Sequence, residues 1–377
     1  MTLRVQIVAA SIVALGASTA MADTFNVVSG QSIQAAITAA ADGDEIFVGP
    51  GTYVENLDMQ GKGLTLRSTN GPMTTIIDGG GIASVISCDV NVPSDCEPII
   101  DGFTITNGLG SFGQGGGIRL RNADGIILNC IVTNNTAGAG GGVFCNGSNA
   151  RFFGCVFRDN TATSLGGAAF VALSSPVFVN CTFGGDSASA GAGIWTSDVN
   201  SRPGILNCIV WGYEDDSFAG SGEAIVSYST VEGGFPGAGN IDFNPLFVNF
   251  AGGDLRLQNG SPAIDAADST IVAETLAVDI DGNPRGADVT TVADTGIPIF
   301  GLTVDMGAFE FPVGDGGPTE CDCPADVAPP GGNGTVNVDD LIAVIVAFGA
   351  CPPADPTEPE PDRLDGGKPS GSGQTLR

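Results

Sequence analysis

The residues of this chain that could perform chemistry are few, and their types restrict what it can do. The sequence contains no histidine, which excludes Ser-His-Asp and Cys-His catalysis and any imidazole metal ligand. It contains 10 cysteines. Four of them, Cys130, Cys155, Cys181 and Cys208, follow one another at intervals of 25, 26 and 27 residues. This spacing predicts that a repeated structural unit positions them.

Composition favours an extended, turn-rich fold over a helical one. The 377 residues include 58 Gly and 22 Pro, with 42% hydrophobic and 15% charged residues. That is enough apolar material for a long core and too little charge for global disorder. The net charge of −29 repels phosphate backbones and anionic lipid headgroups. We therefore expect no nucleic-acid partner.

Residues 1–22 are typical of a signal peptide. Arg4 precedes an apolar stretch from Ile7 to Ala20, and Ala20-Met21-Ala22 has the small-x-small pattern of a cleavage site. About 14 apolar residues are too few to cross a bilayer, which takes ~20. The sequence thus predicts a secreted protein, extracellular or on the surface of a bacterial cell, with no membrane span.

Residues around the four spaced cysteines agree in character from one unit to the next. Each unit holds a glycine cluster, a strand that alternates with period two, and an Asn or Gly directly before the cysteine. A period near 25 with short strands and handed turns predicts one coil of a parallel β-solenoid per unit. We expect coils over residues 61–245. The residues predicted to stack inward as ladders are Ile118, Val143, Ala169 and Ile194; Leu120, Cys145, Val171 and Thr196; and the four spaced cysteines.

These coils, with the segment before them, resemble right-handed parallel β-helix proteins of the pectin-lyase-like superfamily. Residues 23–60 resemble the N-terminal cap of that superfamily through Ser32–Ile37, Gly43–Ile46 and Pro50–Asn56. The resemblance implies an all-β, right-handed parallel β-helix whose open first coil is covered by an amphipathic helix over about Ser32–Ala41.

The segment 246–311 resembles the domain called choice-of-anchor Q, which follows such β-helices in surface proteins. Gly260–Asp265, Asp279–Arg285 and Asp305–Glu310 carry the likeness. We expect a C-terminal cap rich in turns. Asp279 and Asp281 fit either a turn or a metal site, and Asp-Gly and Asn-Pro favour the turn.

Residues 312–353 resemble a single dockerin or EF-hand calcium loop followed by a helix. The likeness runs from Asn333 to Asp340, and it implies a small loop-helix motif that holds a weakly bound calcium ion and docks to a cohesin-like or sorting partner. A metal-free hairpin closed by a Cys323–Cys351 disulfide is the alternative. The dockerin-like resemblance implies these calcium ligands: Asp326, Asn333, Thr335, Asn337 and Asp340.

Residues 354–377 are rich in proline, glycine and acidic residues, and this composition predicts a disordered tail.

The cysteines fall into two groups. Cys88 and Cys96 bracket a short polar loop, and Cys321, Cys323 and Cys351 bracket the C-terminal motif. We expect disulfides between Cys88 and Cys96 and between Cys323 and Cys351. The five cysteines within the coils, Cys145 among them, are predicted to be buried thiols.

Function is predicted at the level of class. We expect a non-catalytic structural, adhesive or carbohydrate-interacting module whose partner is a polysaccharide or a cell-envelope component. The outward residues Phe144, Phe170 and Trp195 are the candidate sugar-stacking strip, with burial beneath a turn as the alternative. The pectin-lyase-like resemblance implies a second possibility, a polysaccharide lyase or glycosidase acting on acidic plant or algal polysaccharide. Its candidate catalytic residues are Arg119, Arg121, Arg151 and Arg158.

Overall fold

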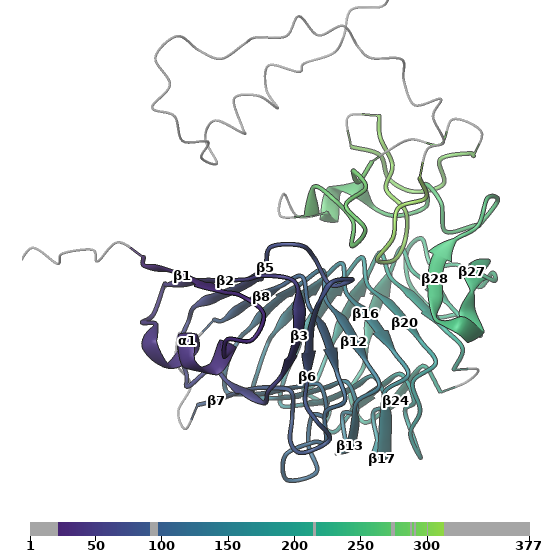
Figure 1. Ribbon diagram of the computed structural model, residues 1–377. Coiled ribbons are helices and arrows are strands. Elements are labelled where there is room, and N and C mark those ends of the chain that lie inside the picture. Colours follow the sequence, from purple (N-terminus) through teal and green to yellow (C-terminus); the bar gives the residue numbers. More distant parts are fainter. Residues whose placement is uncertain are drawn as a thin grey trace, which may run out of the picture. The chain divides into compact units, whose positions relative to one another are not determined.

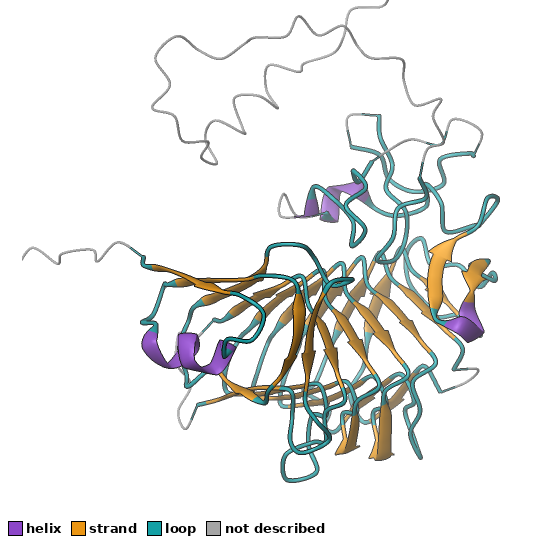
Figure 2. Cartoon of the chain, viewed as in Figure 1, coloured by secondary structure: helices purple, strands orange, loops and turns teal. Residues whose placement is uncertain are grey.

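The protein is a parallel β-helix, as the repeat predicted. The computed structural model describes residues 22–90, 97–213, 216–272, 276–286, 289, 292–299 and 301–312. Three sheets of parallel strands run along the β-helix axis, and each coil contributes one strand to each sheet over most of the length. Figure 1 and Figure 2 show the strands stacked coil upon coil, with the one α-helix of the described residues at the N-terminal end.

The strands divide among three sheets that we call A, B and C. Sheet A holds β1 (Thr24–Val27), β2 (Glu45–Val48), β5 (Thr65–Ser68), β8 (Ile99–Asp101), β11 (Ile126–Leu128), β15 (Arg151–Phe153), β19 (Val177–Val179), β22 (Gly204–Leu206) and β25 (Ile225–Ser227). Sheet B holds β3 (Gly51–Val54), β6 (Thr75–Asp78), β9 (Thr104–Thr106), β12 (Ile131–Thr133), β16 (Val156–Arg158), β20 (Thr182–Gly184), β23 (Ile209–Trp211) and β26 (Thr230–Val231). Sheet C holds β4 (Leu57–Asp58), β7 (Ile86–Asp89), β10 (Ile118–Arg121), β14 (Val143–Asn146), β18 (Ala169–Ala172), β21 (Ile194–Thr196) and β24 (Phe218–Gly220).

Two smaller pairs of strands lie outside these sheets. Strands β13 (Thr136–Ala139) and β17 (Thr161–Leu165) pair in parallel in the turns that lead from sheet B to sheet C. Strands β27 (Phe247–Asn249) and β28 (Asp254–Leu257) form an antiparallel pair after the last coil, with the 3-10 helix η1 (Phe250–Gly252) between them. A second 3-10 helix, η2 (Ser269–Ile271), follows.

The core is built from inward ladders, and the predicted register is confirmed. Ile118 pairs with Val143, Val143 with Ala169, and Ala169 with Ile194. In the centre, two columns of phenylalanine rings interlock. Phe152 stacks on Phe178 at 4.6 Å and Phe157 on Phe183 at 4.8 Å between ring centroids, and rings of the two columns meet edge to face. Offset and edge-to-face contacts add to the stability that burial alone supplies.

The coil cysteines are buried thiols, as predicted. Cys130, Cys145, Cys155, Cys181 and Cys208 are free and buried. Three of them donate to a main-chain carbonyl of the preceding coil, at 3.5 Å each: Cys155 to Ile127, Cys181 to Phe152 and Cys208 to Phe178. Cys88 is buried too, whereas Cys96 lies outside the described residues, so that disulfide stays a prediction.

The corner between sheets A and B explains the Asn or Gly before each cysteine. Asn129, Gly154, Asn180 and Asn207 have φ between 46° and 60°, the left-handed region that these residue types tolerate best. The Asn207 Nδ2 donates to the Asn180 Oδ1 at 3.3 Å. The turn therefore repeats along the axis because its residues all adopt this conformation, and one neighbouring pair of the row is also hydrogen-bonded.

The N-terminal end is closed by α1 (Ile33–Ala39), slightly shorter than the predicted helix. Ser32 is its N-cap, and Ile33 and Ile37 point into the β-helix core. The parallel ladder begins before this helix, because β1 already pairs with β2. The N-terminal cap is thus part of the first coil.

The segment after the coils packs mainly against the side of the β-helix. Its apolar residues, including Leu255, Ile264 and Met306, form one cluster with Val156 and Ile209 of sheet B. Hydrogen bonds fix it to the corner turn and to β20. Asn207 Nδ2 donates to the Asp268 carbonyl and Asn180 Nδ2 to the Asp305 carbonyl, while the Ala308 amide donates to the Thr182 hydroxyl of β20. The segment that we expect to be a C-terminal cap therefore covers the outer side of sheet B.

Candidate functional site

The four candidate arginines do not form one site. Arg119 and Arg121 lie on β10 of sheet C, Arg151 on β15 of sheet A and Arg158 on β16 of sheet B. Arg151 pairs with Glu97 at 3.2 Å, and Arg158 pairs with its neighbour Asp159 at 2.6 Å. Since three different sheets carry them, the structure does not bring these side chains together around one substrate.

Arg119 has a structural role, because it links neighbouring coils of sheet C. Its side chain forms an ion pair with Asp89 of the preceding coil, and the residue is only 4% exposed. The guanidinium carbon also lies 5.3 Å from the ring centroid of Phe112, within the range of a cation–π contact. Arg121 is exposed on the same strand. Arg119 and Phe112 thus bring an arginine and an aromatic ring together beside the outward face of sheet C.

We call the outward row of Arg119, Phe144, Phe170 and Trp195 the C row. The strand register places these residues side by side on successive coils, with Ala219 next in line. The rings of Phe144 and Phe170 stack at 5.1 Å between centroids with an interplanar angle of 2°. Parallel rings one coil apart cover each other's faces, which are the surfaces that a sugar would need.

The three aromatic rings of the C row differ in how far they are exposed to solvent. Phe144 is 2% exposed, so the expectation that a sugar stacks on it is wrong, and the alternative of burial is correct for this residue. The turn before β14 also runs close to this residue, because a Cβ added at Gly140, whose φ is 66°, would lie 3.2 Å from the Phe144 Cα. Phe170 and Trp195 are partly exposed. Trp195 is the last ring of the row, because the next residue in register is Ala219.

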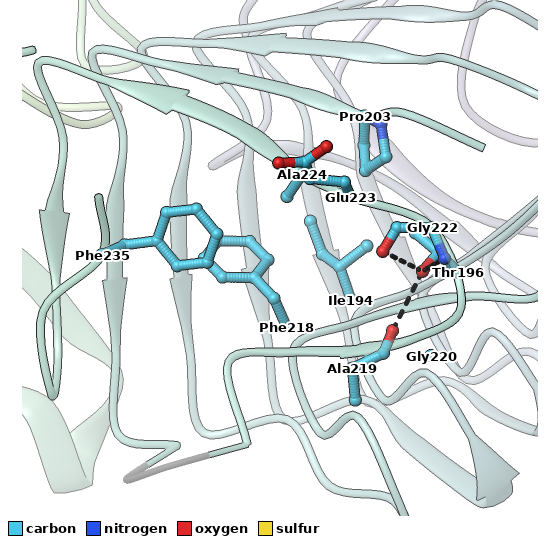
Figure 3. Close-up of a pocket in the computed structure, with 10 residues that line it drawn as sticks. All are labelled: Ile194, Thr196, Pro203, Phe218, Ala219, Gly220, Gly222, Glu223, Ala224 and Phe235. Atoms are coloured by element: carbon cyan, nitrogen blue, oxygen red, sulfur yellow. Dashed lines mark hydrogen bonds between the residues drawn. The ribbon is translucent and has the colours of Figure 1, made fainter. Parts of the chain in front are cut away.

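A pocket of about 200 Å³ lies at the C-terminal end of the coils. Figure 3 shows the rings of Phe218 of β24 and Phe235 next to one another, with Ile194 of β21 on the other side of Phe218. The two phenylalanine rings meet edge to face at 5.0 Å. The Thr196 hydroxyl accepts from the Gly222 amide at 2.9 Å. This pocket is the end of the hydrophobic core, where the turn that carries Phe235 covers the last coil.

A buried ladder of polar side chains was not predicted from the sequence. Asn135 Nδ2 donates to Asn160 Oδ1 at 3.0 Å, and Asn160 Nδ2 donates to Asp186 Oδ1 at 2.8 Å. The Tyr213 hydroxyl donates to the other oxygen of Asp186. Burial raises the pKa of Asp186 to about 7, while the bonds from Tyr213 and Asn160 act in the opposite direction. The signal in the sequence was the recurrence of Asn135 and Asn160 at the coil period.

Carboxylates of the C-terminal segment serve the segment's own folding. Asp279 accepts from the amides of Asp281, Asn283 and Glu310, and Asp281 pairs with Arg256. The turn interpretation of Asp279 and Asp281 therefore fits their contacts. Burial raises the pKa of Glu310 to about 7, although the Arg285 guanidinium, 2.8 Å away, lowers it.

The predicted calcium motif lies outside the described residues. This applies to Asp326, Asn333, Thr335, Asn337 and Asp340, to Cys323 and Cys351, and to the predicted signal peptide up to Met21. Within the part of the chain that the structure describes, no three or more Asp, Glu, Cys or His side chains are grouped to hold a metal. No helix among those residues is long and apolar enough to span a membrane.

A family model matches the coils of this chain, and solved structures match it at low sequence identity. No curated protein matches the sequence. Among solved structures, a pectin methylesterase from carrot matches with 16% identity and a TM-score of 0.35, over 62% of this chain and 80% of that one. A pectin methylesterase in complex with a hexasaccharide matches with 12% identity and a TM-score of 0.32, over 59% of this chain and 92% of that one. Residues 63–240 match the family model described as "Right handed beta helix region", and this stretch of the chain is accordingly a right-handed parallel β-helix.

Proposed function

We propose that this protein is a secreted, non-catalytic module that binds polysaccharide along the outward face of sheet C. Trp195 is the observation that carries the proposal. It ends the aromatic row, it is partly exposed, and its neighbour on the following coil is the small residue Ala219. An indole at the end of a stack offers a sugar ring both apolar area and an N–H donor.

The rigidity of the fold supports the same function. Each strand of sheet C is hydrogen-bonded to the strands of neighbouring coils, so side chains of the C row keep a fixed spacing of ~4.8 Å per coil. A polymer with a regular repeat gains from a surface that is ordered before binding, because little conformational entropy is then lost.

The test uses the two tryptophans of the chain as separate reporters. Trp195 lies on sheet C, whereas Trp211 of β23 lies on sheet B and packs against the C-terminal segment. We expect polysaccharide to change the tryptophan fluorescence of the wild type and of Trp211→Phe, and to leave that of Trp195→Phe unchanged. A response that persists in Trp195→Phe, or no response to any member of a polysaccharide panel, contradicts the proposal.

A polysaccharide lyase is the second candidate, and Arg121 is the residue that favours it. Its side chain is exposed on the outward face of β10, and a lyase requires a basic group that reaches the proton beside a uronate carboxyl. Incubation with polygalacturonate or alginate would then produce unsaturated uronate ends that absorb in the ultraviolet. Arg121→Ala is expected to abolish that signal if the chain is a lyase.

We propose in addition that residues 312–353 bind calcium and dock the protein to a cohesin-like or sorting partner. The sequence of the motif supports this through the Asn333–Asp340 ligand pattern. The β-helix would then present the polysaccharide-binding face, and the C-terminal motif would fix the protein at its place of action.

A further inference from the structure

Phe112 stands at the tip of a tight hairpin between β9 and β10. The Gln114 amide donates to the Ser111 carbonyl at 3.0 Å, which closes a four-residue turn. Its two central residues, Phe112 and Gly113, have φ of 52° and 76°. Positive φ at both positions is the combination of a type I′ turn, and Asn, Asp or Gly is strongly preferred there. A phenylalanine at the first central position opposes this preference.

Burial does not account for this phenylalanine either. Phe112 is 93% exposed, the largest value among the exposed hydrophobic residues of the described chain. A bulky side chain in the left-handed region destabilises the isolated fold, and an exposed ring recovers little of that free energy by packing. Residues held in such conformations occur preferentially at functional sites.

The turn is nonetheless firmly held. Buried Ser84 binds both sides of the hairpin base: its Oγ accepts from the Ser111 amide at 3.0 Å and donates to the Gln114 carbonyl at 3.2 Å. At the tip, the Gly113 carbonyl accepts from the amides of Gly138 and Ala139, both at 2.9 Å. The ring is therefore presented from a rigid base, which reduces the entropy lost when a ligand binds.

The hairpin also places the ring beside the C row. The Arg119 guanidinium carbon lies 5.3 Å from the Phe112 ring centroid, and Arg119 is itself fixed by Asp89. Arg119 precedes Phe144 in the register of sheet C. Phe112 thus lies beside Arg119, at the end of the C row opposite Trp195, and its ring is exposed whereas that of Phe144 is buried.

We propose that Phe112 is a preformed platform on which a pyranose ring of a neutral polysaccharide stacks. This inference rests on the proposed function and names its substrate class. The axial C–H groups of a pyranose suit the negative face of an aromatic ring. The net charge of −29 disfavours polyuronates, anionic membranes and a second copy of the chain, since each would bring like charge close.

The decisive variant is Phe112→Asn, which supplies the residue that a type I′ turn prefers. We expect it to fold with an unchanged or higher melting temperature and to lose about tenfold in affinity, the effect of one good aromatic contact. Phe112→Trp keeps an aromatic face and is expected to bind within about threefold of wild type. Phe243→Asn removes another exposed phenylalanine, 64% exposed and beyond the last coil, and is expected to change nothing.

The measurement is calorimetric titration with cellohexaose, xylohexaose, mannohexaose and hexagalacturonate. The proposal requires binding of at least one neutral hexasaccharide and the weakening of that binding by about tenfold in Phe112→Asn. Binding of hexagalacturonate alone overturns the neutral class. If self-association in the ultracentrifuge or binding to phosphatidylcholine vesicles requires Phe112, the ring serves another partner and the proposal is overturned. Glycan binding that Phe112→Asn retains and Trp195→Phe loses overturns this inference and leaves the proposed function intact.

Discussion

Glu55 and Lys62 hold the two ends of α1 from the coil beneath it. The Glu55 carboxylate accepts from the Ser32 hydroxyl at 2.8 Å and from the amides of Ile33 and Gln34 at 2.9 and 3.0 Å. The Lys62 ammonium donates to the carbonyls of Ile37, Thr38 and Ala40 at 2.7 to 3.1 Å. A carboxylate at the N-terminus and an ammonium at the C-terminus satisfy the unpaired helix groups and complement the helix dipole.

This arrangement predicts the effect of Glu55→Ala. The helix has only 7 residues, too few to be stable without tertiary contacts. We expect the variant to lower the free energy of unfolding by about 1–2 kcal/mol, because amide donors at the helix start lose their acceptor. Urea denaturation followed by circular dichroism measures this loss. The control is Glu223→Ala, whose side chain is 79% exposed and 3.4 Å from Arg202; an equal loss there would contradict the capping role.

Periodic features of this fold could be predicted from sequence because each is local and repeated. The inward ladders follow from alternation with period two, and the corner follows from Asn and Gly at a position that needs positive φ. The segment Pro50–Asn56 carried the resemblance to an N-terminal cap, and the structure shows why Glu55 belongs there. In each case, the residue types at a few positions of the coil were enough to predict the feature.

Features that depend on contacts between distant segments could not be predicted. Outward residues such as Phe144 and Trp195 look alike in sequence, but their exposure depends on which turn covers them. The segment 246–311 was expected to close an end, whereas its apolar residues fit the outer side of sheet B. Phe112 was missed because its residue type contradicts its turn, and no local pattern predicts a residue that opposes local preference.

Calcium binding is predicted to be weak and confined to the C-terminal motif. Asp326 and Asp340 supply only two carboxylates, so we expect a dissociation constant of ~10⁻⁴ to 10⁻³ M, the range of extracellular modules. Calorimetry of the full chain measures it, with Asp340→Ala expected to abolish the heat. The melting of the β-helix is expected to be the same with and without calcium. The absence of binding heat at millimolar calcium would favour the disulfide-closed hairpin.

The coil thiols are predicted to be inert in the folded protein. Burial raises the pKa of Cys145 to about 12, and it also raises the pKa of Cys130, Cys155 and Cys181. The thiolate is the reactive form, so alkylation at neutral pH should leave these residues unmodified until the chain unfolds. Mass spectrometry without reduction checks this, and it also tests the predicted disulfide between Cys88 and Cys96. Peptides joined through Cys155 and Cys181 would contradict the prediction.

Asp186 is predicted to make stability depend on pH near neutrality. Burial raises its pKa from 3.8 to about 7 in the folded chain, so the unfolded chain releases this proton more readily. The stabilising contribution is complete below about pH 4 and is lost as the pH rises through about 7. Asp186→Asn does not titrate, and its amide extends the ladder of Asn135 and Asn160. We therefore expect the variant to gain stability relative to wild type as the pH rises, on the order of 2–4 kcal/mol at pH 8.

The control for this pH dependence is Asp198, whose pKa is shifted in the opposite direction. Hydrogen bonds, first that from the Leu173 amide, lower the pKa of Asp198 to about 2, so its contribution is present above about pH 4 and is lost only as the pH falls toward 2. Asp198→Asn is therefore expected to leave the pH dependence between 5 and 8 unchanged. Urea unfolding of both variants and the wild type at pH 5 and pH 8 separates the two effects. If the difference between wild type and Asp186→Asn is the same at both pH values, Asp186 is ionised in the folded chain and the ladder carries a buried charge.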